Sequence, residues 1–274
     1  MARLQAQIRA QPQKAELRLA LCHFLALRGE WPRAQEQARQ ARKLDASMTP
    51  AAASCEMALR GEEQRDAVWQ ARGQPSALAG EHPDWVQLLL QALALGSAQG
   101  GAAEAAALRS QALEMAPALA GTVTIASSQG TAEEDLEPTE NLPVLWTSDG
   151  DARLGPVLEL FTAAGYGWLP MSALRRVSFR RPRHLVDLLW APVEMTLHDG
   201  TTGSALMPVR YPGVGVDTDD ALMLGRRTDW TALPPGEEQY AGQGQRIFIT
   251  DAGDLPLLDL RTIEWQAPAA SGQP

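Results

Sequence analysis

Apolar positions in the first 120 residues recur at the spacing of helices that bury one face. The stretch that begins at Ala15 ends at Gly29, and a glycine in the left-handed conformation commonly follows a helix. A second stretch then places small residues on one face, where they allow two helix backbones to approach closely. The pattern therefore predicts a pair of packed helices of tetratricopeptide type over residues 15–47. The apolar face of the first helix holds Leu17, Leu21, Phe24, Leu25 and Leu27, and the small residues of the second are Ala34, Ala38 and Ala41.

A weaker helix pair is predicted after residue 84, and a long helix is predicted between the two pairs, from Ala51 to Ala71. A glycine break from Gly96 to Gly101 divides the second pair. Matching intervals at two places indicate a helical repeat. The apolar face consists of Trp85, Leu88, Leu89, Ala92 and Leu93. Ala34 and Ala41 follow Gly29 by five and 12 residues, and Ala105 and Ala112 follow Gly100 by the same two intervals.

From Leu142 onward the pattern changes to short apolar runs separated by turn dipeptides, which is typical of strands. Asp199-Gly200 between two apolar runs predicts a tight hairpin. The segment from Asp217 to Arg227 fits either a short helix or a further strand. Strands are predicted at 143–147, 156–162, 167–170, 174–179, 192–197, 203–208, 246–250 and 255–260.

These patterns predict an α+β fold, in which an all-α tetratricopeptide-like array precedes a mainly antiparallel, open barrel-like β domain. Residues 121–150 contain six acidic side chains and no basic one. The stretch from Glu133 to Pro138 is also poor in apolar anchors, which is typical of a linker. We expect a helical domain at 1–120, an acidic linker at 121–141, a β-rich domain at 142–266 and a disordered tail at 267–274.

The net charge of −9 argues against a general role in binding nucleic acids or anionic membrane surfaces. No run of about 18 apolar residues is present and the N-terminus has no apolar signal core, so neither a membrane span nor export is expected. The two cysteines, Cys22 and Cys55, fall in predicted helices and cannot build a disulfide framework. Together these features predict a cytoplasmic protein.

No group of residues has the spacing of a recognised catalytic, cofactor or metal site. The four histidines share no metal-ligand spacing with one another or with the cysteines, and the sequential Cys22 and His23 point to different helix faces. A G-x-S-x-G nucleophile elbow is absent. The acidic segment Asp217 to Asp220 and the segment Gly242 to Gly244 lack the context of a phosphate-binding loop and are interpreted as turns. We therefore predict no catalytic residue, no metal ligand and no cofactor.

Two groups of residues are candidates for named roles. The basic run from Arg175 to Arg183 is favoured as a solvated strand face, with a grip on an acidic helix or a phosphate as the alternative. The rigid segment Pro208 to Gly213 is favoured as a fixed turn over a partner contact. The candidate packing residues of the first helix pair are Gly29, Trp31, Ala34 and Ala41. The candidate partner contacts are Arg175, Arg176, Arg180, Arg210 and Tyr211.

The second half also carries a series of distinctive short sequence motifs, which follow the helical repeat. In this order they resemble the ImpE/TagJ family of type VI secretion accessory proteins. The resemblance covers nearly the whole chain except the acidic linker and the tail. The motifs are RLGPVLE at 153–159, YGWLP at 166–170, PVRYPG at 208–213, RRTDW at 226–230, GQR at 244–246, TD at 250–251 and LLDLR at 257–261.

The resemblance implies an adaptor that binds the small sheath subunit of the secretion system through the N-terminal helix of that subunit. It also implies an indirect influence on sheath disassembly by the associated AAA+ ATPase. A helical repeat suits such a role because its concave face can accept a partner helix. The residues by themselves indicate only a helical-repeat binding module joined to a β domain.

The rival interpretation is an enzyme that holds a small ligand among the tryptophans and arginines of the β domain. A deep pocket in which Arg210, Arg246 and Asp251 converge would favour the enzyme. An open apolar groove on the helices would favour the adaptor.

Overall fold

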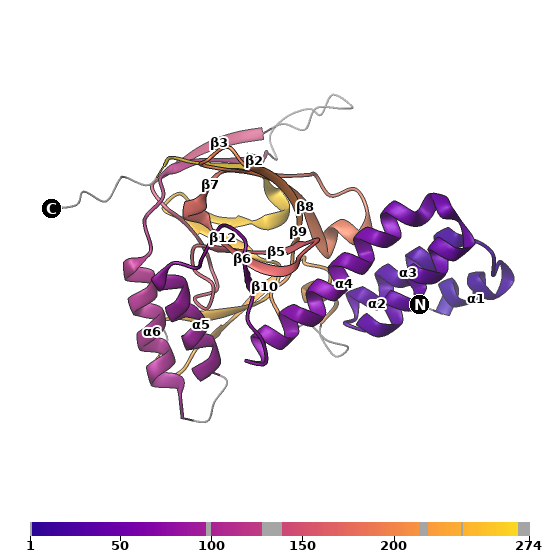
Figure 1. Ribbon diagram of the computed structural model, residues 1–274, viewed down its shortest axis with the longest axis horizontal. Helices are drawn as coiled ribbons and strands as arrows, with labels where there is room; N and C mark the ends of the chain where they lie inside the picture. The colour runs from indigo at the N-terminus through magenta and orange to yellow at the C-terminus, as the bar shows by residue number, and fades with distance from the viewer. Residues whose placement is uncertain (1, 97–99, 128–138, 214–218, 237, 268–274) are drawn as a thin grey trace.

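The computed structural model describes residues 2–96, 100–127, 139–213, 219–236 and 238–267. Helices form the first part of the chain and strands dominate the rest, so the predicted α+β class is confirmed (Figure 1). The α-helices are α1 (Ala2–Ala10), α2 (Ala15–Leu27), α3 (Trp31–Leu44), α4 (Thr49–Trp69), α5 (Asp84–Gly96), α6 (Ala102–Met115) and α7 (Asp220–Met223). Short 3-10 helices are η1 (Ala46–Met48), η2 (Met171–Ala173), η3 (Leu185–Leu188) and η4 (Leu257–Asp259).

The strands form one large sheet and two small ones. The first seven are β1 (Ser76–Ala77), β2 (Gly121–Ala126), β3 (Thr139–Val144), β4 (Thr147–Asp149), β5 (Val157–Thr162), β6 (Gly165–Pro170) and β7 (Leu174–Phe179). The others are β8 (Trp190–Leu197), β9 (Thr202–Pro208), β10 (Thr228–Ala232), β11 (Tyr240–Gly244), β12 (Ile247–Thr250), β13 (Gly253–Pro256) and β14 (Leu260–Trp265).

The α2–α3 hairpin forms where the small-residue pattern predicted it. Gly29 adopts a φ of 73°, a conformation that favours glycine and allows the tight turn between the helices. Ala34 and Ala41 have no exposed surface, so the two helices pack closely at these positions. Trp31 begins α3 and is half-buried against the adjoining core.

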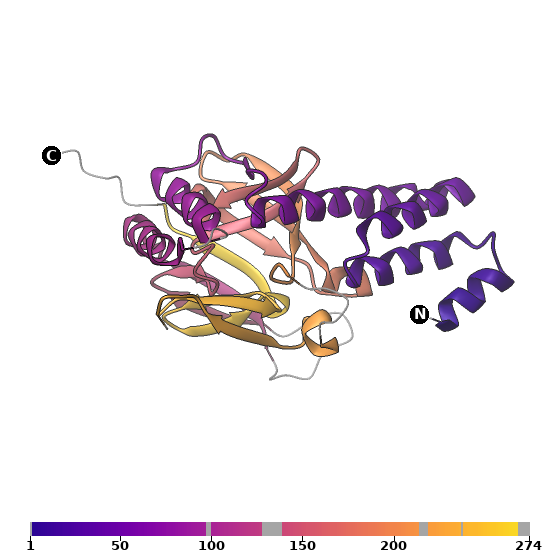
Figure 2. The same ribbon diagram turned by 90° about the horizontal axis from the view of Figure 1, so that it is seen from below.

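The two helix hairpins lie apart and do not stack into one continuous array. The views in Figures 1 and 2 both place α2 and α3 in an arm at one end of the molecule and α5 and α6 at the other. The long helix α4 runs from the arm onto the sheet, where it packs on β5 and β6. The predicted helix pairs are therefore present, but the expected stacking of repeats is not, because α4 and the sheet separate them.

The large sheet has nine strands in the order β1-β6-β5-β9-β8-β7-β14-β2-β3. The neighbouring strands are antiparallel except for β1 and β6, which are parallel. Within the described residues its two edges, β1 and β3, do not pair with each other, so the sheet is not closed and the expected open barrel-like form is not found. The small sheets are β13-β12-β4 and the hairpin β10-β11.

The expected acidic linker begins with a strand. Residues 121–126 form β2, which pairs with β14 on one side and β3 on the other. Val123 is fully buried, so this segment belongs to the β core. The acidic composition of the neighbouring residues concealed a short alternating strand. Residues 128–138 of the predicted linker and 268–274 of the predicted tail lie outside the described residues.

The strand predicted at 255–260 is instead broken into β13, η4 and β14. Pro256 ends the first strand, and Leu257 turns inward, where it is buried and its amide donates to the carbonyl of Arg246. The same order of elements occurs earlier, where Pro170 precedes η2 between β6 and β7. An apolar run that looks continuous in sequence is therefore a sharp corner in the fold.

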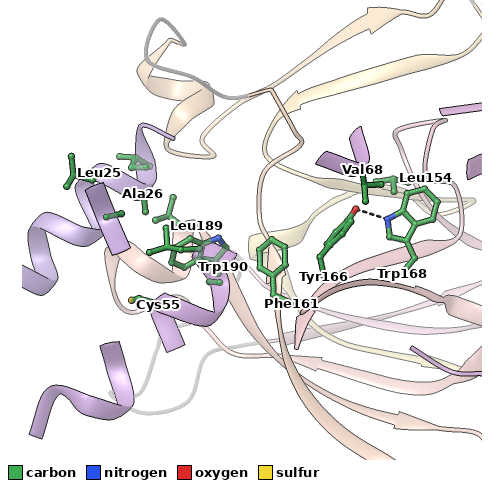
Figure 3. Close-up of a cluster of buried hydrophobic side chains, with 14 of the residues drawn as sticks. Leu25, Ala26, Cys55, Val68, Leu154, Phe161, Tyr166, Trp168, Leu189 and Trp190 are labelled. Atoms are coloured by element: carbon green, nitrogen blue, oxygen red, sulfur yellow. Dashed lines mark hydrogen bonds between the residues drawn. The ribbon is translucent and has the colours of Figure 1, made fainter. Parts of the chain in front are cut away.

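The main hydrophobic core joins the helices to the sheet. Leu25, Ala26 and Cys55 from the arm belong to the same buried cluster as Phe161 and Trp190 from the sheet (Figure 3). A second cluster lies wholly among the strands and the residues leading into them, and includes Val177, Phe248 and Ile263. The arm is thus packed onto the β unit through a shared core.

Gly61 sets the distance between α4 and the sheet. A Cβ atom at this position would lie 2.3 Å from Cδ1 of Phe161. Alanine is favoured over glycine inside a helix by about 1 kcal/mol, but overpacking a tight interface costs about 1–3 kcal/mol. We expect Gly61→Ala to lower the free energy of unfolding in urea. Gly96→Ala is the control, because its Cβ would lie 3.9 Å from its nearest neighbour. A gain of stability in both variants would contradict this packing.

Ala34→Leu should also destabilise the fold. The added atoms would force apart the closely packed α2 and α3 and lower the free energy of unfolding by about 1–3 kcal/mol. Ala53→Leu makes the same change at an exposed position of α4 and should leave stability nearly unchanged. Thermal melts of both variants check this expectation, and equal melting temperatures would argue against close helix packing at Ala34.

Candidate functional site

A cleft of about 400 Å³ opens where the helical arm meets the sheet. Three segments that are far apart in sequence contribute to it, so it exists only in the folded chain. Arg28, Gly29 and Trp31 come from the α2–α3 turn, Glu62, Arg65 and Asp66 come from α4, and residues 210–213 come from the segment that follows β9.

The outer wall of the cleft combines a half-buried aromatic ring with exposed charge. The ring is that of Trp31, at the first position of α3. The Arg28 side chain is 38% exposed, and its Nε atom donates a 3.2 Å hydrogen bond to Glu30. Such a wall offers an apolar anchor beside a cation that solvent can reach.

The floor of the cleft is charged and fixed. Glu62 and Arg65 lie one turn apart on α4, and both are buried. The indole nitrogen of Trp190 donates to Glu62 over 2.9 Å. Arg65 uses two nitrogens to bind both carboxylate oxygens of Glu159, at 2.9 and 2.7 Å. A paired fork of this kind is among the stronger hydrogen-bonded arrangements.

Arg210, a candidate partner contact, is a buried tie between three parts of the structure. It is only 5% exposed. One guanidinium nitrogen donates to the carbonyl of Leu27 over 3.1 Å and to that of Met223 over 2.8 Å, while its own carbonyl accepts from Arg65 over 3.0 Å. Burial lowers the pKa of Arg210 to about 10. The side chain therefore links the arm to the β unit, and only its edge lines the cleft.

Tyr211, another candidate contact, is also turned inward. Its hydroxyl donates to Asp149 over 2.8 Å, and its ring lies under Arg246, with 5.2 Å between the guanidinium carbon and the ring centroid. The ring occupies the space left by Gly242, where a Cβ would lie 2.2 Å away. The PVRYPG motif at 208–213 is thus a fixed turn, which is the interpretation that the sequence favoured.

Beneath the cleft, Glu159 is the centre of a buried polar network. Arg65, Arg246 and Tyr166 all bind its carboxylate, and the Trp69 indole donates to it over 2.9 Å. The network extends through Trp168, which donates to the Tyr166 hydroxyl over 2.7 Å (Figure 3), and through the ion pair of Arg246 with Asp149. Most of the sequence motifs that carry the family resemblance contribute residues to this network or to the cleft above it.

The charges in this network shift two carboxyl groups in opposite directions. Burial alone would raise the pKa of Glu159, but Arg65 and Arg246 outweigh it and hold that pKa well below its usual range. At Asp149 burial prevails over Arg246, and the pKa rises to about 6. Glu159 is therefore held as an anion.

The other candidate contacts lie on a different surface. Arg175 and Arg176 on β7 line a shallow depression shared with β8 and β9. The guanidinium of Arg176 lies 3.1 Å from Glu264, and that of Arg180 lies 2.8 Å from Glu194. Both pairs are exposed, so this face agrees with the solvated-strand interpretation. The structure does not bring these arginines together with Arg210.

The three residues that would have favoured an enzyme do not converge. Arg246 is fully buried in the network, whereas Asp251 lies in the turn after β12 and accepts from the amide of Leu145 over 2.7 Å. The large tryptophans Trp168 and Trp190 are core residues whose indole nitrogens are already bonded. Neither of the expected alternatives, a convergent pocket or an open apolar helix groove, describes the cleft, which is of mixed character.

The described part of the chain holds no cluster of three or more metal-ligating side chains. The sulfur of Cys55 lies 3.4 Å from Nε2 of His23, and both cysteines are free and buried. Among the helices described, none has the length and apolar character needed to cross a membrane.

Two floor residues, Glu62 and Arg65, were missed in the sequence. They stand among exposed charges of α4 and look like part of its solvated face. The available signal was their spacing to Trp69, because steps of three and four residues place all three on one side of the helix. That side proves to face the sheet.

Comparison with known proteins gives consistent matches. The family model described as ImpE protein matches residues 141–264. The chain is 40% identical, over 265 residues, to the type VI secretion system accessory component TagJ of Pseudomonas aeruginosa, and the match spans 96% of this chain and 85% of that protein. The crystal structure of protein VPA1032 from Vibrio parahaemolyticus superposes with a TM-score of 0.79 at 25% sequence identity, covering 98% of this chain and 93% of that one.

Removing the charge of Glu159 should destabilise the protein strongly. Glu159→Gln leaves Arg65 and Arg246 buried without their shared counter-charge, which typically costs about 3–5 kcal/mol. Urea unfolding measures the loss. Glu194→Gln is the control, because it breaks an exposed ion pair that contributes little. Similar stability of the two variants would show that the network around Glu159 is not what mainly holds α4 on the sheet.

The pH dependence of stability should carry the signature of the same group. Because the folded-state pKa of Glu159 lies below its ordinary value of 4.5, its contribution is complete above pH 4.5 and is lost as the pH falls. Asp149 acts in the opposite sense between 3.8 and about 6 and shares Arg246 with Glu159, so wild type and Glu159→Gln are compared below pH 3.8. That difference should shrink on acidification, and a constant difference would contradict the assignment.

Proposed function

The chain belongs to the ImpE/TagJ family of type VI secretion accessory components, and we propose that it acts as an adaptor that holds the small sheath subunit. The 40% identity to TagJ carries this proposal, because it extends over 96% of the chain and so includes the helical arm as well as the β unit. An adaptor role in that system places the protein in the cytoplasm, the compartment expected from the sequence.

The arm and the cleft at its base support a helix-in-groove contact. The arm projects from the β unit, and α2, α3 and the first half of α4 lie side by side in it (Figures 1 and 2). We place the N-terminal helix of the sheath subunit across the base of this arm. An apolar side chain of that helix would pack on Trp31, and its charged neighbours would meet Arg28 and Asp66.

The fixed floor favours such a role over catalysis. Glu62, Arg65 and Arg210 are all engaged with other parts of the chain, so they give the cleft a constant shape. Because the groove is already formed, binding does not require it to be ordered. The main entropic cost of binding is then the ordering of the partner's own helix. The resulting affinity is expected to be of micromolar order.

The influence on sheath disassembly follows as the indirect part of the proposal. A subunit held through its N-terminal helix is kept in a defined position relative to the sheath. The AAA+ ATPase would then act on a sheath whose subunits are marked or restrained by the adaptor, without a direct contact between the adaptor and the ATPase.

Calorimetry with the full-length protein tests the contact. A synthetic peptide of the N-terminal helix of the small sheath subunit from the same bacterium should bind with micromolar affinity. Trp31→Ala should weaken binding about tenfold, equivalent to about 1.4 kcal/mol. Trp146→Ala is the matched control, since this tryptophan is 37% exposed and lies just before β4, outside the cleft.

A charge reversal gives a second, independent measurement. Arg28→Glu alters the exposed wall without removing core atoms and should also weaken the peptide, whereas Arg180→Glu on the strand surface should not. Salt should have only a small effect, because residues 1–120 carry 13 basic and 12 acidic side chains. Absence of binding by the wild type would overturn the adaptor proposal. Weakening by Arg180→Glu alone would move the contact to the β unit.

A further inference from the structure

A notch of about 230 Å³ lies between the β10–β11 hairpin and the β12–β13 hairpin, apart from the residues that the proposed contact uses. Its lining is two aromatic rings, one aliphatic side chain, one carboxylate and one glycine. These residues are Trp230, Tyr240, Ile249, Asp254 and Gly150.

The two rings stand on one face of the hairpin because of its register. Trp230 pairs with Gly242 and Ala232 pairs with Tyr240, so the rings are diagonal neighbours across the two strands. Trp230 is 38% exposed and Tyr240 is 41% exposed. Large aromatic side chains with this much free surface are ready to contact a partner.

The position of Trp230 is fixed by what lies behind it. Its ring packs beside that of Tyr211, with 5.7 Å between centroids. A Cβ atom on Gly150 would lie 2.6 Å from the far end of the indole, so only glycine leaves room for it. The partly exposed indole is therefore held in place before any partner arrives.

A carboxylate completes the notch. Asp254 lies directly opposite Ile249 in the β12–β13 pairing and is exposed. Within the described residues its side chain has no hydrogen bond and no basic partner. The notch thus offers two partly exposed aromatic side chains, one aliphatic side chain and one negative charge that the chain does not neutralise.

We propose that this notch binds an arginine side chain of a partner protein. A guanidinium can stack on an aromatic face while its nitrogens pair with a carboxylate, which a purely apolar side chain cannot do. The charge balance agrees, because residues 151–274 carry 15 acidic and 11 basic side chains, which favours a basic partner segment. The site is a second contact, and it does not depend on the identity of the partner in the cleft.

Nuclear magnetic resonance of the full-length protein labelled with ¹⁵N tests the site. The indole N–H signal of Trp230 is assigned by its loss in Trp230→Phe. Titration with N-acetyl-arginine methylamide should shift this signal with a dissociation constant in the millimolar range, as expected for a single side chain. The matching citrulline amide, which has the same shape without the charge, should bind at least about fivefold more weakly, a ratio equivalent to about 1 kcal/mol.

Two substitutions separate charge recognition from apolar contact. Asp254→Asn should reduce arginine binding to the level of citrulline, while Asp259→Asn, an exposed aspartate outside the notch, should leave it unchanged. Unchanged signals elsewhere in the spectrum show that each variant remains folded. The proposal is overturned if the matching leucine amide binds as tightly as arginine, if Asp254→Asn has no effect, or if no ligand shifts the Trp230 signal.

Discussion

The buried carboxylate of Glu159 is the group on which the rest of the structure depends. It binds Arg65 from α4 and Arg246, the residue that precedes β12, so the long helix and this segment are held on the same carboxylate of β5. A buried charge without its partners is strongly unfavourable. The helix α4, which runs out into the arm, is therefore tied to the β unit through a buried ion pair. Arg210 adds a second tie, because it bonds the carbonyl of Leu27 at the end of α2.

This arrangement explains how the cleft can have a rigid floor and an adaptable rim. The polar groups of the floor residues are already hydrogen-bonded within the chain, so a binding partner need not reorganise them. Arg28 and Trp31 at the rim are only partly covered and can adjust to what binds. Tyr211 lies between the cleft and Trp230, so a single ring separates the two proposed contact surfaces. An adaptor gains from two contacts held at a constant separation, since the second then forms at a high effective concentration.

Local signals in the sequence predicted the local structure well. Gly29 and Ala34 indicated a helix turn and a close helix contact, and the spacing of turn dipeptides located most strands. The features that failed depend on distant partners. Residues 121–126 form a strand because β14 lies beside them, and the corner at Pro256 requires the pocket that Leu257 fills. Arg65 and Glu159 are 94 residues apart, so no periodicity connects them. Arg210 and Tyr211 were identified as distinctive, but only the packing shows that they point inward.

The corner at Pro256 and the earlier one at Pro170 have a joint consequence. In each, a strand, a turn closed by a threonine hydroxyl, a second strand, a proline and a 3-10 helix lead into a third strand, with Thr162 and Thr250 bonded alike to the turn that follows. The third strands, β7 and β14, are antiparallel neighbours, and Val177 stands opposite Ile263, its counterpart in the other copy. The first two strands of one copy lie in the nine-stranded sheet, whereas those of the other lie in the three-stranded sheet. The β unit therefore contains the same succession of elements twice, and the two copies meet where their final strands pair.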